Sequence, residues 1–140
     1  MIKKKYRILL AEDDKYISAA FYQGLTMAGF EVIPAYDGEE ALTKIRTSQP
    51  DLIMLDILMP KKDGFEVLEE LNREETTGMI GGNERKSAPI IAFTNMDQEQ
   101  DIKRARDLGV TEYLVKANYS MSEVIKKIKG HLGISDKSGK

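Results

Sequence analysis

Five polar residues suited to phosphoryl-transfer chemistry each follow a short apolar run of the sequence. Glu12 and Asp13 come after the first run, Asp56 after the third, Thr94 after the fourth and Lys116 after the fifth. If the runs are parallel strands of one sheet, their carboxyl ends meet at one edge, which is where such sheets bind ligands. We therefore expect these five side chains to share one crevice.

The chemistry of this crevice follows from its charges. Clustered carboxylates repel one another, and their pKa values rise unless a cation neutralises them. Oxygen ligands suit Mg²⁺ and offer zinc little, and Mg²⁺ bridges readily to a phosphoryl group. Asp56 could then attack phosphorus to form an aspartyl phosphate, Lys116 could pair with the phosphoryl oxygens, and Thr94 could donate a hydrogen bond to one of them. The residues thus predict Mg²⁺-assisted phosphoryl transfer.

The elements that must position these residues are strands and helices in alternation. Each apolar run is nearly continuous, as in a parallel sheet covered by helices on both faces, and stretches of helical period separate the runs. This pattern predicts an α/β fold with a doubly wound, five-stranded parallel sheet. The expected strands are Arg7 to Ala11, Glu31 to Ala35, Leu52 to Leu55, Pro89 to Phe93 and Tyr113 to Val115.

Apolar stripes and end signals locate the helices. We expect Asp37 and Glu40 to form a capping box, Asp14 to cap the helix after the first strand, and Gly109 and Gly133 to end helices in a left-handed conformation. The last helix should span about Ser122 to Leu132. The expected stripes are Ile17, Ala20, Phe21, Gly24 and Ala28 in one helix and Ala41, Leu42 and Ile45 in the next.

One stretch, Arg73 to Ala88, has no period and many turn formers, and it predicts a long surface loop whose role is open. The 140 residues suit a single domain over residues 1–133 with a short polar tail at 134–140. Because few residues follow the last helix, we expect no effector domain in this chain, which is either a stand-alone regulator or a fragment.

Composition excludes several classes of function. The net charge of −2 gives no reason to expect a nucleic-acid or membrane-surface binder. The chain has no cysteine, so it has no disulfide framework and no thiolate nucleophile. No segment approaches the ~20 apolar residues of a membrane span. We expect a soluble, cytoplasmic protein.

Four segments together, LLAEDD, LIMLDILMPKKDGFEVL, IIAFTN and YLVKA, resemble the receiver domains of bacterial two-component response regulators, in order and spacing. The resemblance implies a flavodoxin-like (βα)₅ fold with strand order 2-1-3-4-5. It also implies a phosphorelay in which a histidine kinase, a phosphotransfer protein or a small phosphodonor supplies phosphate.

The resemblance also implies a role for each site residue. Asp13 would bind Mg²⁺ directly, Glu12 would act through water, Asp56 would be both phosphoacceptor and metal ligand, and the backbone carbonyl of Leu58 would be a further ligand. A receiver catalyses only its own phosphorylation and dephosphorylation, and is not a turnover enzyme.

Two further residues, Thr94 and Tyr113, would form the switch. Thr94 would be the switch hydroxyl, Tyr113 the aromatic that changes rotamer, and Lys116 the lysine typical of the family. The fourth helix, fifth strand and fifth helix would then present an altered face to a downstream protein partner. No direct contact with nucleic acid or membrane is implied.

The residues also leave alternatives. Receivers usually have proline after the lysine, whereas this chain has Ala117, so the Lys116–Ala117 bond should be trans with a shifted loop or a strained cis bond. Ala117 favours a pseudo-receiver that keeps the fold without turning over phosphate. A hydrolase resembling the haloacid-dehalogenase group would need a second aspartate where Leu58 stands. Tyr113 could be half-buried packing, and His131 should be a surface residue.

Overall fold

The computed structural model describes residues 4–77 and 88–134. Its sheet has five parallel strands in the order β2-β1-β3-β4-β5, which confirms the predicted fold class and strand order. The strands are β1 (Arg7–Ala11), β2 (Glu31–Ala35), β3 (Leu52–Leu55), β4 (Ile90–Thr94) and β5 (Glu112–Val115).

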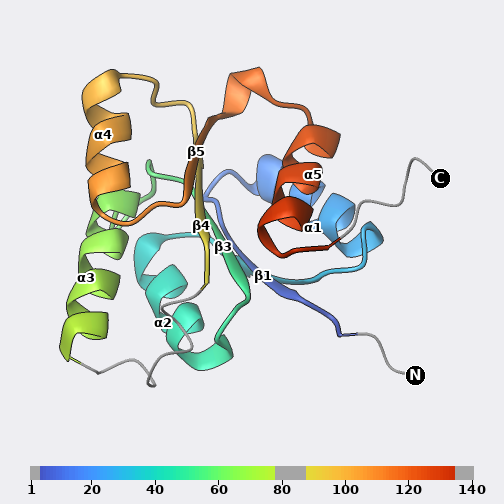
Figure 1. Cartoon of the computed structure of the whole chain (residues 1–140), viewed down its shortest axis with the longest axis horizontal. Coiled ribbons are helices and arrows are strands. Elements are labelled where there is room, and N and C mark those ends of the chain that lie inside the picture. Colours follow the sequence, from blue (N-terminus) through green and yellow to red (C-terminus); the bar gives the residue numbers. More distant parts are fainter. Residues whose placement is uncertain (1–3, 78–87, 135–140) are drawn as a thin grey trace.

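Helices cover both faces of this sheet. Figure 1 shows α1 and α5 on one side, and α2, α3 and α4 on the other. The helices are α1 (Lys15–Met27), α2 (Gly38–Ser48), α3 (Gly64–Thr77), α4 (Glu99–Asp107) and α5 (Met121–His131), with a short 3₁₀ helix, η2 (Lys116–Asn118), after β5.

The two faces carry separate apolar cores because successive strand residues point to opposite sides of a sheet. In β1, Ile8 and Leu10 pack in the cluster with α1 and α5, whereas Leu9 and Ala11 pack in the cluster with α2, α3 and α4. All four residues of β3 are buried, as the continuous apolar run predicts. The carboxyl ends of the central strands therefore emerge from a fully packed sheet.

Most predicted helix ends are confirmed. The Asp14 carboxylate accepts hydrogen bonds from the first turn of α1, and Gly109 and Gly133 have φ of 102° and 70°. The Asp37 carboxylate accepts from the Glu40 amide at 2.7 Å, but Glu40 accepts from the Tyr36 amide rather than from that of Asp37. The predicted capping box is thus half formed.

Two sequence-based expectations were wrong. The first concerns one residue of the predicted α1 stripe: Ala20 is exposed, whereas Ile17, Phe21 and Ala28 pack in the core, together with the unpredicted Ser18 and Leu25. The second is the loop predicted from Arg73, because α3 continues to Thr77. Residues 78–87 lie outside the described part.

Within the two described ranges, no helix is both long and apolar enough to cross a membrane.

Candidate functional site

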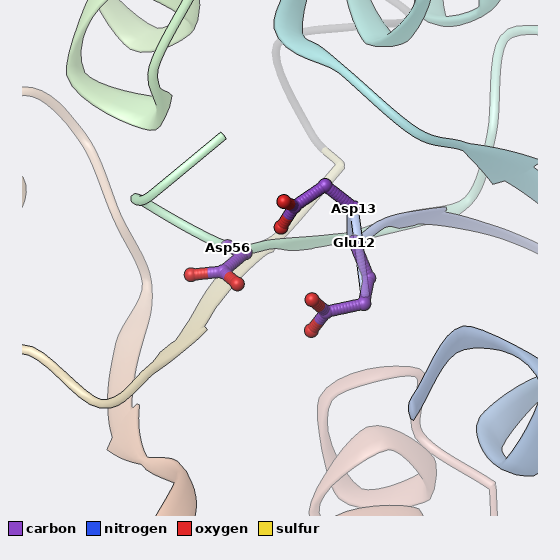
Figure 2. A group of neighbouring side chains, drawn as sticks. All are labelled: Glu12, Asp13 and Asp56. Atoms are coloured by element: carbon purple, nitrogen blue, oxygen red, sulfur yellow. The ribbon is translucent and has the colours of Figure 1, made fainter. Parts of the chain in front are cut away.

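Three carboxylates meet where β1 and β3 end. Glu12 and Asp13 follow β1, Asp56 follows β3, and one oxygen from each lies within 4.8 Å of the others. Figure 2 shows the three side chains turned toward a common space. Glu12 and Asp56 are buried, at 2% and 5% exposure, whereas Asp13 is exposed. The cluster is therefore closed toward the protein and open to solvent at Asp13.

Strand pairing brings these residues together. Ala11 and Leu55 are partners in the parallel ladder of β1 and β3, so the residues that follow them leave the sheet side by side. The Asp56 amide donates to the Ala11 carbonyl at 3.0 Å, and the Glu12 amide donates to the Ala35 carbonyl at 2.9 Å. Both acidic residues thus have backbones fixed by the sheet.

Lys116 reaches into the cluster from the start of η2. Its ammonium lies 2.6 Å from Glu12 Oε1 and 2.9 Å from Asp56 Oδ2. Burial alone would lower the pKa of Lys116, but the hydrogen bonds to Asp56 and Glu12 outweigh it and raise the pKa. For Glu12, burial is the largest effect and raises the pKa despite the bond from Lys116. The ammonium therefore neutralises part of the charge of two buried carboxylates.

The peptide bond between Lys116 and Ala117 is trans, since no cis bond occurs among the described residues. The structure thus selects the trans alternative, and Lys116 still points at Asp56. A proline is not needed to aim this lysine into the site.

The donor set fits a magnesium ion. The cluster offers carboxylate oxygens, which a hard divalent cation prefers, and the exposed Asp13 leaves room for the waters that Mg²⁺ retains. Asp56 Oδ1 accepts from the Leu58 amide at 3.1 Å, and Glu12 Oε2 accepts from the Asp14 amide at 3.1 Å. Three carboxylates against one ammonium leave net negative charge for a cation to neutralise.

The sequence profile described as "Response regulator receiver domain" matches residues 8–129 of the chain. The chain belongs to this family. It is 35% identical to the alkaline phosphatase synthesis transcriptional regulatory protein PhoP of Bacillus subtilis, over 93% of the chain and 50% of that protein. It is 36% identical to the DNA-binding dual master transcriptional regulator RpaA of a Synechocystis species, over 94% of the chain and 51% of that protein. This receiver domain thus spans about half the length of these curated relatives.

Solved structures agree with this assignment. A response regulator receiver domain protein (CheY-like) from Methanospirillum hungatei superposes with a TM-score of 0.81 at 26% identity, covering 93% of this chain and 95% of the other. The receiver domain of the Francisella response regulator 1452 gives a TM-score of 0.79 at 26% identity, covering 92% and 98%. Both similarities cover more than nine-tenths of this chain.

The two residues expected to form the switch of this receiver lie beside the cluster and share a partner. Thr94, fully buried at the end of β4, accepts from the Met96 amide at 3.4 Å through Oγ1. Tyr113 is buried, and its hydroxyl donates to the Met96 carbonyl at 2.7 Å. Burial, followed by the negative charges of Asp101, Asp56 and Asp97, raises the pKa of Tyr113 to about 12.

Sequence reasoning missed Met96 as the partner of both residues, because its backbone rather than its side chain makes the bonds. It also missed the ion pair between Lys116 and Glu12. Other sequence-selected residues lie away from the cluster: His131 pairs with Glu112 of β5 at 2.7 Å and is exposed, as expected.

Proposed function

We propose that this receiver domain accepts a phosphoryl group on Asp56 in an Mg²⁺-dependent reaction. The observation that carries the proposal is the position of the Lys116 ammonium, which bonds to both Glu12 and Asp56 within the carboxylate cluster. The donor is a histidine kinase, a phosphotransfer protein or a small phosphodonor, as in a two-component phosphorelay. The receiver modifies itself and does not turn over a substrate.

Each residue of the cluster has a part in holding the ion. Asp13, Asp56 and the backbone carbonyl of Leu58 would hold Mg²⁺, and Glu12 would act through water. When bound, the ion neutralises the carboxylates and the charge that develops on the phosphoryl oxygens.

The transfer exchanges one bond at phosphorus for another. A carboxylate oxygen of Asp56 forms the new bond to phosphorus while the bond from phosphorus to the donor's leaving atom breaks, and the donor keeps that electron pair. Asp56 ceases to be an anion, so Lys116 is released from it and pairs with a phosphoryl oxygen instead. The ion pair of Lys116 with Glu12 keeps the ammonium next to the phosphate.

The switch begins at Thr94. Before phosphorylation, the Thr94 hydroxyl accepts a hydrogen bond from the Met96 amide. After phosphorylation, a phosphoryl oxygen attracts this hydroxyl. The Tyr113 hydroxyl donates to the Met96 carbonyl. A shift of Thr94 therefore moves both the loop between β4 and α4 and the Tyr113 side chain on β5. The face formed by α4, β5 and α5 (Figure 1) then changes for a downstream protein partner in the cytoplasm, with no direct contact with nucleic acid.

We propose that the receiver domain spans residues 1–133 and that residues 134–140 form a polar tail. The 35% identity to a transcriptional regulatory protein supports a signalling role. The rival pseudo-receiver rests on Ala117, but the bond of Lys116 to Asp56 opposes it. A hydrolase resembling the haloacid-dehalogenase group would need a second aspartate two residues after Asp56, and this chain has Leu58 there.

The test is incubation with Mg²⁺ and acetyl phosphate, followed by intact-mass measurement. We expect one phosphoryl adduct on the wild type, none on D56N, none without Mg²⁺, and a wild-type result for D14N, which removes a neighbouring charge while asparagine still caps α1. Absence of the wild-type adduct would favour the pseudo-receiver. Continuous release of phosphate would favour the hydrolase.

A further inference from the structure

The loop that follows the phosphoacceptor contains a tight, strained turn. The Lys62 amide donates to the Pro60 carbonyl at 2.8 Å, two residues back, and the residue between them, Lys61, has φ of 69°. A three-residue turn with positive φ at its centre is rare and strained for a residue that carries a side chain. Such a turn persists only where its surroundings hold it in place.

The first turn of α2 supplies that support. The Gly38 amide, at the start of α2, donates to the same Pro60 carbonyl at 3.4 Å. Asp37, which caps α2, lies 3.6 Å from the Lys61 ammonium through Oδ2, while its Oδ1 accepts from the helix. The strained turn is thus joined to α2 by one backbone hydrogen bond and one ion pair.

The fit at Gly38 leaves no room for a side chain. A Cβ there would lie 2.0 Å from the Lys62 carbonyl oxygen and 2.6 Å from the Lys62 carbonyl carbon. Both are backbone atoms, so no rotamer change relieves the contact, and either the turn or α2 must move. Glycine is required here by close approach of two backbones.

The far end of the loop is fixed close to Asp56. The Gly64 amide, at the start of α3, donates to the Ile57 carbonyl at 2.7 Å, and Ile57 is fully buried. The Leu58 amide donates to Asp56 Oδ1 at 3.1 Å. Only the few residues from Leu58 onward can therefore absorb a displacement of the turn, and Leu58 is the one whose carbonyl is proposed to bind Mg²⁺.

We propose that Gly38 is a positioning residue for phosphorylation: the first turn of α2 braces the strained Pro60–Lys62 turn, and this brace sets the Leu58 carbonyl for Mg²⁺. The inference rests on the proposed function and deepens it, because it assigns to α2 a part in metal affinity although α2 contributes no ligand. Supporting groups around a metal site change its affinity about 10- to 100-fold when they are lost.

The main test compares G38A with G130A, which adds the same methyl group where nothing lies within 4 Å. The dissociation constant for Mg²⁺ is measured by titration calorimetry at a temperature where circular dichroism shows each variant folded. We expect about tenfold weaker binding for G38A and wild-type binding for G130A. The core variant V124A, on α5, controls for stability: it should lower the Tm and leave Mg²⁺ affinity unchanged.

A second pair keeps the inference testable if G38A does not fold. D37A removes the cap of α2 and the partner of Lys61, whereas S120A removes the corresponding cap of α5. We expect D37A to weaken Mg²⁺ binding several-fold and S120A to leave it unchanged. If the wild type binds no Mg²⁺ and forms no adduct, the proposed function itself fails. If the wild type binds Mg²⁺ and both G38A and D37A bind it as tightly as the wild type, then α2 does not position the Mg²⁺ site.

Discussion

Lys116 is the residue on which the electrostatics of the site depend. Two buried carboxylates side by side are costly unless a cation pairs with them, and the Lys116 ammonium bonds to both. Sequence reasoning assigned this neutralising role to Mg²⁺ alone. The structure shares it between an internal cation and the ion, so the Lys116 ammonium and Mg²⁺ compete for the charge of the same carboxylates and repel each other.

This competition gives a prediction for K116M, which removes the charge and keeps a flexible apolar side chain. We expect Mg²⁺ to bind about tenfold more tightly, or ~1.4 kcal/mol, because no ammonium occupies Glu12 and Asp56. Phosphorylation by acetyl phosphate should nevertheless slow, because the phosphoryl oxygens lose their partner. Titration calorimetry and intact mass measure the two effects. K103M, on the exposed face of α4, is the control; weaker Mg²⁺ binding by K116M would contradict the competition.

The sequence located the carboxylates and Lys116 because residues that follow parallel strands must gather at one edge. It could not show which oxygens Lys116 contacts, because that depends on a side chain crossing between the ends of β5, β1 and β3. Backbone partners such as Met96 leave no trace in residue type. Single residues in such a site are predictable, but their pairings are not.

At the scale of elements, α5 is fixed to β5 by a three-residue ionic contact. Glu112 of β5 accepts from Lys127 at 2.8 Å and pairs with His131 at 2.7 Å. Burial alone would raise the pKa of Glu112, but the hydrogen bonds from Lys127 and His131 outweigh it and hold the pKa below its usual value. The contact holds the last two turns of α5 against the edge strand.

The sign of this pKa shift predicts a pH dependence. A carboxylate with a lowered folded-state pKa stabilises the protein above its unfolded pKa, and this contribution is lost as the pH falls through the folded-state value. We expect E112Q to lower the free energy of unfolding by about 0.5–1 kcal/mol at pH 7, and the difference from wild type to be smaller at pH 3. Urea unfolding at both pH values measures it, with E99Q on α4 as the control. An unchanged difference at pH 3 would assign the effect to packing.

The length of α3 shows where element-level prediction fails. The sequence from Arg73 has no apolar period, so it predicts a loop, yet α3 runs on to Thr77. Glu74 explains part of the extension: it is buried and paired with Arg46 of α2. A helix can thus be held by an ion pair to its neighbour, and hydrophobic periodicity does not record such a contact.

At the scale of the whole molecule, the fold and the site make opposite demands. The continuous apolar strands that made the fold predictable bury the sheet on both faces. The same packing forces three carboxylates together at its open edge, where their repulsion opposes folding until cations are present. Stability and function are therefore linked through the charge at one edge of the sheet.

This linkage predicts a reversal of stability order between wild type and D13N. Without Mg²⁺, D13N should be more stable by about 1 kcal/mol, the scale of one interaction between charges near solvent, because Asp13 is exposed. With Mg²⁺ at a hundred times its dissociation constant, the wild type should gain about 2.7 kcal/mol, whereas D13N should gain little after losing a direct ligand. Thermal unfolding in EDTA and in Mg²⁺ measures both, with D107N on α4 as the control. If D13N gains as much from Mg²⁺ as the wild type, Asp13 does not bind the ion and the assignment of the cluster is wrong.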